Sequence, residues 1–485
     1  MSFPSELARQ YIDGEWLTGS GAWDIIDFNP GNGEKLCSVT VATAEEVDLA
    51  YRAAERAQRE WAAVSPYERR AVLDNAVRLV GERSGEITEL IIEELGGTRE
   101  RAAYEVEAAQ ELLREAAGQA MSPVAGLLPS AAGGREDRVY RLPVGVVGVI
   151  GAFDFPLLVT MRTVAPALAL GNAVVVKPHQ HAPVTGGGLV ARVFEDAGLP
   201  AGLLNVLITD SAEIGDSFIQ HPVPEVISFT GSARVGRHVA AVAAGLLKRT
   251  VLELSGSSAL VVLEDADLDH AVRDVVHSRF LFQGQAGVAA RRILVARSVE
   301  KEFTERLTAA VSTLPPGDTG DPDARIGPAL SAFQAEALTA LVDGAIEAGA
   351  TALVRGRARG NRVGPTVLSG LPEGSPLLEQ EIFGPVTLLV PFDGEGEAVR
   401  IVNGTPCGLS GAVHTADVER GVRFARRITG GTFHVGGAAV QGGPVAASGW
   451  EERPGTGRLN GAAAVEAFTT RKWISVQHGR TVFPF

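Results

Sequence analysis

Residues 144–178 read VGVVGVIGAFDFPLLVTMRTVAPALALGNAVVVKP, and the segment GGGLVARVFEDAG follows at residues 186–198. The runs VGVVGVI and AVVVKP are almost wholly apolar, which is typical of strands that are buried on both faces of a sheet. Each run is followed by a segment with the composition of a helix, so strands and helices alternate. This alternation predicts an α/β fold with a parallel sheet covered on both faces.

The composition is ordinary for a globular protein. The chain has 485 residues, enough for two or three domains with a large core, and a formal net charge of −14. This charge argues against nucleic acid or an anionic membrane as a partner. No segment approaches the roughly 18 apolar residues that span a bilayer, and the N-terminus has no basic flank followed by an apolar stretch. We therefore expect a cytoplasmic protein.

The remaining N-terminal part also has recognisable patterns. YIDGEW at residues 11–16 and DFNPGNGE at residues 27–34 predict strands joined by turns. Residues 43–119 are rich in Ala, Glu and Arg and predict amphipathic helices, whereas the small residues at 122–134 predict a loop.

Several motifs follow one another in a specific order. The segment that leads to Lys177 is followed by SFTGSARVG at 228–236, LELSG at 252–256, EIFGPV at 381–386 and FTTRKW at 468–473. Their sequences and their order resemble the aldehyde dehydrogenase superfamily, and FDFPL and FLFQGQ are most similar to its aromatic-aldehyde branch, the benzaldehyde dehydrogenases. One such motif alone would be weak, but this many in order are specific.

The resemblance implies an aldehyde dehydrogenase-like α/β fold in three parts. A Rossmann-like dinucleotide-binding domain takes residues 1–121 and 142–253, and an α/β catalytic domain takes residues 254–443. A small β oligomerisation arm takes residues 122–141 and 464–485. It also implies a small-molecule substrate and a homodimer or homotetramer.

The segment FLFQGQAGVAARR at residues 280–292 resembles the family's nucleophile segment, yet it lacks the nucleophile. It fits a pattern close to F-x-x-Q-G-Q-x-C-x-x-x-x-R, in which the cysteine position is Gly287. Because a thiolate makes the attack on the aldehyde carbon in this family, a glycine removes covalent catalysis. The separation from Glu253, which matches the family's general base, suits the family's spacing.

A cofactor site for NAD or NADP is implied by the same resemblance. The family's lysine at the position of Lys177 holds the adenosine ribose through its ammonium group. The loop with Gly231 and Ser232 lies against the pyrophosphate, where a helix N-terminus offers free N–H groups. Glu381 and Phe383 belong to the segment that holds the nicotinamide ribose.

The choice between NAD and NADP stays open at this stage. Gln180 stands three residues after the lysine, where the family often has a glutamate that excludes a 2′-phosphate. With His179 and His181 alongside, nothing in the sequence repels NADP.

The reaction centre departs from the family at Asp154, which replaces an asparagine whose amide helps to hold the oxyanion. Loss of one oxyanion donor typically costs about a hundred- to a thousandfold in rate, and here a carboxylate takes its place. If Asp154 and Glu253 lie close together, they would share a proton and one pKa would rise. The alternative is that Glu253 is an inherited residue paired with backbone donors.

Other departures predict a remodelled pocket. Phe282 stands where a polar residue is common, Ser257 replaces a lysine, and Gly436 replaces an asparagine. The segment PVAASGW, which begins at Pro444, replaces a P-F-G-G segment.

Cys37 and Cys407 are the two cysteines of the chain, too few and too far apart to indicate a disulfide scaffold or a metal site. Cys407 stands in CGLS, where the family commonly has an aromatic residue. A relocated nucleophile there is the less favoured reading, since free cysteines are usually packed as small apolar residues.

Together these features favour an NAD(P)-dependent oxidoreductase without thiol catalysis. It would move hydride between nicotinamide and a small carbonyl compound, imine, alcohol or aldehyde hydrate, with Glu253 or Asp154 handling the proton. Two alternatives stay open, a catalytically silent nucleotide-binding homologue and a non-redox enzyme that uses the carboxylates. The presence of Lys177, Ser232 and Glu381 favours the hypothesis of an oxidoreductase over that of a non-redox enzyme.

Overall fold

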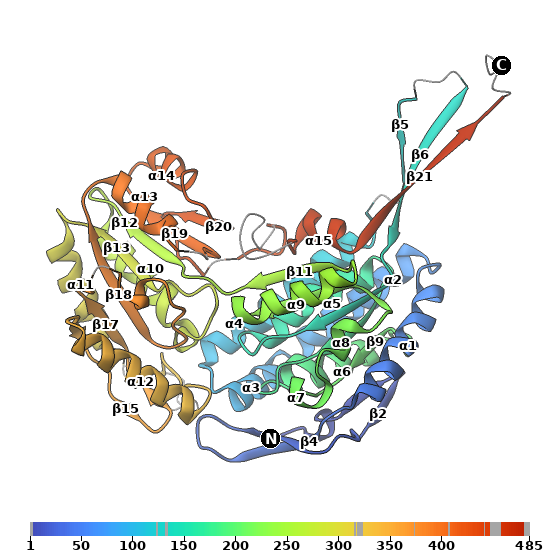
Figure 1. Ribbon diagram of the computed structural model, residues 1–485, viewed down its shortest axis with the longest axis horizontal. Coiled ribbons are helices and arrows are strands. Elements are labelled where there is room, and N and C mark those ends of the chain that lie inside the picture. The colour runs from blue at the N-terminus through green and yellow to red at the C-terminus, as the bar shows by residue number, and fades with distance from the viewer. Residues whose placement is uncertain are drawn as a thin grey trace.

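A computed structural model describes residues 3–122, 125–130, 134–314, 317, 324–372, 374–405, 408–440, 442–446 and 457–479. Its first large sheet contains the predicted parallel strands (Figure 1). Seven strands lie in the order β11-β10-β7-β8-β9-β1-β2, with bounds Arg249–Leu254, Pro224–Gly231, Val146–Ile150, Ala173–Lys177, Leu204–Val206, Gln10–Ile12 and Glu15–Leu17. The first five run parallel, and the hairpin β1–β2 adds an antiparallel edge. The predicted α/β fold with a parallel sheet is confirmed.

Four helices precede the parallel strands, as the segment 43–119 predicts. They are α1 Ala44–Trp61, α2 Pro66–Glu82, α3 Ser84–Leu95 and α4 Arg99–Gln119. Local signals fix their starts: Thr43 and Glu46 form a capping box at α1, and Ser65 caps α2. Before them, the predicted turn-linked strands include β3 (Asp24–Phe28) and β4 (Lys35–Thr40), which pair as a hairpin.

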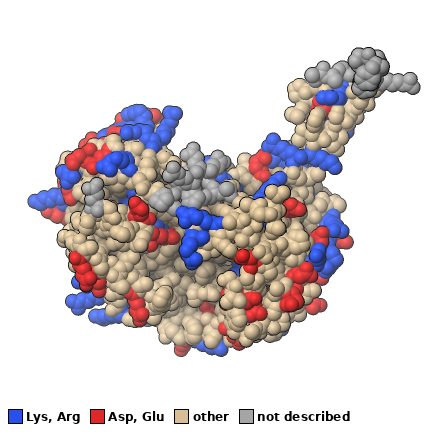
Figure 2. All heavy atoms as spheres, viewed as in Figure 1, with Lys and Arg blue, Asp and Glu red and all other residues tan. Residues whose placement is uncertain are grey.

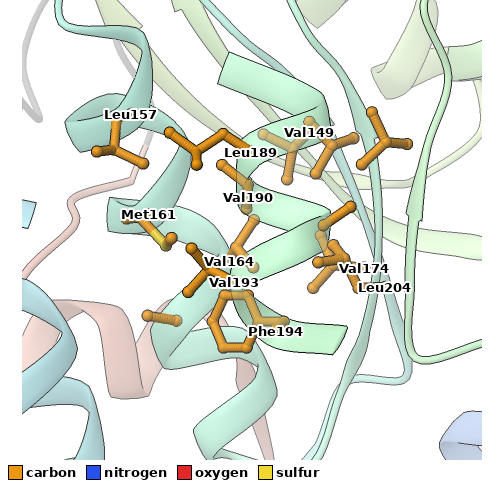
Figure 3. Packing of buried hydrophobic residues seen from close by; sticks show 14 of the residues in the cluster. Val149, Leu157, Met161, Val164, Val174, Leu189, Val190, Val193, Phe194 and Leu204 are labelled. Carbon is orange, nitrogen blue, oxygen red and sulfur yellow. The ribbon is translucent and has the colours of Figure 1, made fainter. Parts of the chain in front are cut away.

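Helices α5 (Pro156–Ala169) and α6 (Leu189–Asp196) pack against β7, β8 and β9. Figure 3 shows their apolar side chains meeting those of the strands, among them Leu157, Met161, Val164, Val174, Val190, Phe194 and Leu204. Burying a side chain of this size stabilises the fold by about 1.5–3 kcal/mol. This packing holds α5 in place beside the sheet.

The second large sheet also has seven strands and is largely parallel. Its order is β14-β17-β18-β13-β12-β19-β20, with bounds Thr351–Val354, Thr366–Ser369, Val386–Phe392, Arg292–Ala296, Ala259–Val262, Ser410–His414 and Thr432–Val435. Its helices are α10 Leu268–Phe280, α11 Glu300–Ser312, α12 Ala332–Glu347, α13 Glu395–Asn403 and α14 Val418–Ala425. The chain passes from the first sheet to the second between β11 and β12. The domain limits given above stay predictions.

An arm of three strands projects from the body (Figure 1). Its order is β21-β6-β5, with bounds Thr469–Gln477, Arg135–Pro143 and Ala125–Leu128. The loop predicted at 122–134 is therefore wrong over β5. The side chains of β5 are all exposed, so its sequence carries no burial pattern, and pairing with β6 makes it a strand.

Acidic and basic side chains intermingle on the face of the molecule seen in Figure 2. Among the described residues, no helix is both long and apolar enough to cross a membrane. The same residues contain no group of His, Cys, Asp and Glu side chains arranged to hold a metal ion.

Candidate active site

A pocket of about 440 Å³ lies where elements of both large sheets meet. The first sheet and its helices contribute Gly231, Glu253 and parts of α4 and α5. Further parts of the wall come from β19, β20 and residues 286–288, 439–440, 442–444 and 446. Because the carboxyl ends of parallel strands meet at one edge, Gly231 at the end of β10 and Glu253 near the end of β11 come together.

Gly287 and Asp154 face each other in this pocket. The Gly287 N–H donates a hydrogen bond of 3.0 Å to Oδ2 of Asp154. A Cβ atom added at Gly287 would stand 3.4 Å from Cβ of Ser255 and 3.8 Å from that carboxylate oxygen. Both distances are ordinary contacts, so the backbone leaves room for a side chain, and glycine is not required here by crowding.

The pKa of Asp154 is well above that of an ordinary aspartate. Burial raises its pKa to about 6, and the nearby carboxylate of Glu381 also raises it. The Gly287 N–H and the guanidinium of Arg101 oppose this rise because both favour the ionised form. Asp154 is therefore a protonated, hydrogen-bond-donating acid below about pH 6 and a carboxylate above it.

Glu253 also lies in this pocket, where its carboxylate pairs with an arginine. Its side chain is 5% exposed and forms an ion pair with Arg162, whose Nη1 lies 3.0 Å from Oε2 and 3.3 Å from Oε1. The carboxylate that raises the pKa of Asp154 is Glu381. The expected rise of one pKa is found at Asp154, where burial is its largest cause, and the sharing of a proton between Asp154 and Glu253 stays a prediction.

Arg101 supports the turn that carries Asp154. Its buried guanidinium lies 4.5 Å from the ring centre of Phe155 and 4.0 Å from that of Phe282, and it pairs with Glu105 at 2.7 Å. Glu105 in turn accepts hydrogen bonds from the first turn of α5. Phe155 and Phe282 both adopt left-handed backbone conformations with φ of 51°.

Only some of the residues that predict a remodelled pocket line its wall. Phe282, Ser257 and Gly436 do not line the pocket, whereas Pro444 does. Phe282 is fully buried and its role in the structure is contact with Arg101. Cys407 lies outside the described residues.

Residues expected to hold the cofactor lie mainly at one edge of the first sheet. Lys177 ends β8, and burial lowers its pKa. Gly231 ends β10, and Ser232 caps helix α9 (Ala233–Gly245) by accepting a hydrogen bond from the N–H of Val235. Gly231 also lines the pocket, which Lys177 and Ser232 do not reach.

Two aromatic contacts link this edge to the nicotinamide segment. Phe153 lies 5.9 Å from Phe383 and 5.3 Å from His179 between ring centres. Burial lowers the pKa of His179 to about 3, so this ring is neutral near pH 7 and supplies no charge for a 2′-phosphate. Gln180 is exposed beside it.

Glu381 is bound by Arg291, whose Nη2 lies 2.8 Å from Oε1. Sequence reasoning did not identify Arg291, Arg162 or Arg101 as part of the site. Arg162 does have a signal in the sequence, because it is a lone charged residue inside the apolar helix PLLVTMRTVAPALA. The partners of the other two arginines depend on chain packing.

The model of the aldehyde dehydrogenase family matches residues 16–474. The chain belongs to the aldehyde dehydrogenase family. It is 47% identical over 480 residues to benzaldehyde dehydrogenase YfmT of Bacillus subtilis, with 99% of each chain covered. The resemblance to the family and to its benzaldehyde dehydrogenase branch is confirmed, and the chain is an oxidoreductase of this superfamily.

Two solved structures are similar over almost their whole length. An NAD-dependent benzaldehyde dehydrogenase from Corynebacterium glutamicum has a TM-score of 0.89 and 38% identity, covering 97% of this aldehyde dehydrogenase chain and 98% of the other. A salicylaldehyde dehydrogenase from Pseudomonas putida G7, complexed with salicylaldehyde, has a TM-score of 0.95 and 33% identity, covering 98% and 99%. The predicted aldehyde dehydrogenase-like fold is thereby confirmed.

Proposed function

We propose that this family member transfers hydride between a nicotinamide dinucleotide and a small carbonyl compound, imine or alcohol without a covalent intermediate. The observation that carries the proposal is the contact between the Gly287 N–H and Asp154 in a pocket that Glu253 also lines. No cysteine belongs to the described lining of this pocket. Carboxyl groups remain there to move protons.

The residues at the edge of the first sheet fit NAD or NADP. The first turn of α9 leaves the N–H groups of Ala233 and Arg234 without partners inside the helix, which suits a pyrophosphate. Lys177 supplies an ammonium group for ribose hydroxyls, and Glu381, oriented by Arg291, supplies a carboxylate for the second ribose. When bound, the nicotinamide ring accepts or donates hydride.

Without a thiol, oxidation of an aldehyde to the acid balances when the substrate is the aldehyde hydrate, the product of water addition to the carbonyl group. The hydrate loses its C–H hydrogen as hydride with two electrons, and one O–H proton leaves to a carboxylate, which yields the carboxylic acid. Glu253 or Asp154 takes that proton. Above about pH 6 Asp154 is ionised and able to accept it.

Aromatic aldehydes are the favoured substrates. The relatives reported above are named for benzaldehyde and salicylaldehyde. In this chain, Phe155, Leu158, Val159, Leu281 and Val288 supply apolar wall for an aromatic ring. Apolar walls with a few polar groups are typical of small-molecule sites.

The arm is proposed to join copies of the chain into a homodimer or homotetramer. Its side chains Leu127, Leu128 and Trp473 are 69%, 55% and 62% exposed. Such a concentration of exposed apolar side chains is typical of an interface.

The proposed domain limits remain 1–121 with 142–253, then 254–443, with the arm at 122–141 and 464–485.

The deciding experiment supplies benzaldehyde that carries deuterium on its carbonyl carbon, together with NAD or NADP. Mass spectrometry should find the deuterium in the reduced cofactor, and no acyl group should remain on the protein after rapid quenching. The matched control is the variant Cys37→Ser with Cys407→Ser, which should transfer deuterium equally well. A trapped thioester, or no deuterium transfer to either cofactor, would overturn the proposal.

A further inference from the structure

The pocket has a recess beside Gly287 with room for a further carbon atom. The nearest atoms to a Cβ added at Gly287 are two carbon atoms of Ser255, at 3.4 and 3.6 Å, and Oδ2 of Asp154, at 3.8 Å. These are ordinary contact distances, so an atom of a bound molecule can take this position without displacing its neighbours. Gly287, Ser255 and Asp154 all line the pocket, so the recess is part of it.

The recess offers both apolar and polar contacts. Ala286 and Val288, the chain neighbours of Gly287, line the pocket with apolar side chains. Asp154 is a carboxylate above about pH 6, and its Oδ2 can accept a further hydrogen bond besides the one from the Gly287 N–H. The Ser255 hydroxyl is buried without a hydrogen-bond partner among the described residues, so a polar group beside it would supply one. A molecule suited to the recess therefore combines an apolar group with a hydroxyl.

The charge and the size of the pocket limit this molecule further. The described lining contains carboxyl groups on Glu111, Asp154 and Glu253 against one guanidinium, on Arg162. Because this excess of negative charge repels anions, an uncharged molecule is favoured. The pocket volume of about 440 Å³ is typical of sites for small molecules, so an aromatic ring and a second short chain both fit.

We propose that the pocket oxidises the adduct of an aromatic aldehyde with an uncharged low-molecular-weight thiol and releases a thioester. In the bound adduct the sulfur occupies the recess beside Gly287, the ring lies against the apolar wall, and the hydroxyl donates to Asp154. A thioether sulfur suits this recess because it is polarisable and needs no hydrogen bond. The thiol is thus a second substrate. This inference rests on the proposed function, because it names the substrate of that same pocket.

The reaction balances with an oxidised nicotinamide dinucleotide as the oxidant. In solution the thiol sulfur bonds to the carbonyl carbon and its proton moves to the carbonyl oxygen, which gives a neutral hemithioacetal. In the pocket that carbon loses its hydrogen as hydride, with two electrons, to the dinucleotide. The O–H proton passes to Asp154, a carbon–oxygen double bond forms, and the thioester leaves with its carbon–sulfur bond intact.

A carboxylate at residue 154 suits this substrate better than an amide does. The adduct enters the pocket as a neutral molecule, so no thiolate has to approach the negative charge of Asp154. An amide could donate to an oxyanion but could not accept the O–H proton. Gly287 and Asp154 are therefore explained together, because the first leaves room for the sulfur and the second takes the proton.

The test supplies benzaldehyde and NAD or NADP to the full chain with rising concentrations of N-acetylcysteamine, an uncharged thiol. Reduced cofactor should form at least about tenfold faster than without thiol, because the adduct gains apolar contact in the recess. Mass spectrometry should find one benzoyl thioester for each reduced cofactor. The S-methyl derivative of N-acetylcysteamine has no S–H group and should have no effect, and the anionic 3-mercaptopropionate should accelerate the reaction less.

Binding is measured separately, by calorimetry without cofactor, with 1-phenyl-1-butanol, in which a CH₂ group replaces the sulfur of an ethanethiol adduct. One enantiomer should bind at least about tenfold more tightly than benzyl alcohol. The isomer 4-propylbenzyl alcohol, which has the same added carbons on the far side of the ring, should gain less. Gly287→Val fills the recess and should remove the gain of 1-phenyl-1-butanol. The control Gly344→Val lies on α12, outside the described pocket lining, and its added Cβ has no neighbour within 4 Å, so it should keep the gain.

A second variant tests the proton acceptor. Asp154→Asn should still bind 1-phenyl-1-butanol but form the thioester about a hundredfold more slowly, because its amide cannot take the O–H proton. Thermal unfolding checks that each variant is folded.

Three results would overturn the inference: no thioester from wild type, equal acceleration by the S-methyl derivative, or a binding gain that survives in folded Gly287→Val. Deuterium transfer that the thiol does not accelerate would also overturn it and would leave the proposed function standing. Absence of hydride transfer both with and without thiol would overturn both.

Discussion

Introducing a thiol at residue 287 should give aldehyde oxidation only together with a second change at residue 154. The contacts predict that Gly287→Cys fits, since its Cβ would lie 3.4 Å from Cβ of Ser255 and 3.8 Å from the Asp154 carboxylate. At pH 8 that carboxylate, with a pKa of about 6, is protonated only about 1% of the time. The negative charge of Asp154 would repel both a thiolate at residue 287 and the oxyanion that forms beside it.

Asp154→Asn removes this charge and can keep the existing contact. Its amide oxygen can accept from the backbone N–H of residue 287, as Asp154 does at 3.0 Å, while its NH₂ group donates to an oxyanion. One such donor is worth about a hundred- to a thousandfold in rate. We therefore expect the double variant to oxidise benzaldehyde at least about 100 times faster than Gly287→Cys, with Asp154→Asn alone gaining no thiol-dependent activity.

The assay is formation of NADH or NADPH with benzaldehyde for wild type, both single variants and the double variant at pH 8. Cofactor binding is measured in each so that a lost cofactor site is not taken for lost chemistry. Glu253→Gln in the double background should abolish steady turnover if Glu253 activates the water that releases the acid. A single Gly287→Cys variant as fast as the double would refute the reasoning about Asp154.

Three further outcomes are expected. Lys177→Met should weaken NAD or NADP binding about tenfold or more in calorimetry while leaving the thermal midpoint nearly unchanged, and wild type that binds neither cofactor at millimolar concentration would contradict the cofactor site. Replacing Cys37 and Cys407 by serine should preserve whatever steady-state activity wild type has, whereas loss of activity in Cys407→Ser alone would support a relocated nucleophile. Asp27 is buried, and burial with the nearby Glu94 raises its pKa to about 9. Because this folded-state pKa lies above the ordinary value, the stability it contributes is complete below about pH 4 and is lost as pH rises toward 9. Asp27→Asn should flatten this decline and raise the free energy of unfolding at pH 8 by at least about 1 kcal/mol in urea titrations, and an unchanged pH profile would contradict the assignment.

Local sequence determined much of the fold. The apolar runs around residues 146–150 and 173–177 specify buried parallel strands, because a strand covered on both faces has no polar side to alternate with. Thr43 and Ser65 mark helix starts, since their side chains satisfy backbone N–H groups that no helical carbonyl can reach. Strand β5 was not predicted from the sequence, because its side chains are exposed and only pairing with β6 makes it a strand.

For the site, the sequence by itself determined which residue types are available, including the glycine at 287, the acid at 154 and the glutamate at 253. Tertiary structure alone decided how they are paired. The Gly287 N–H meets Asp154 across 133 residues of sequence, and Arg162 meets Glu253 across 91. Burial and a neighbouring charge, which depend on the whole fold, set the pKa of Asp154, and no local pattern contains them.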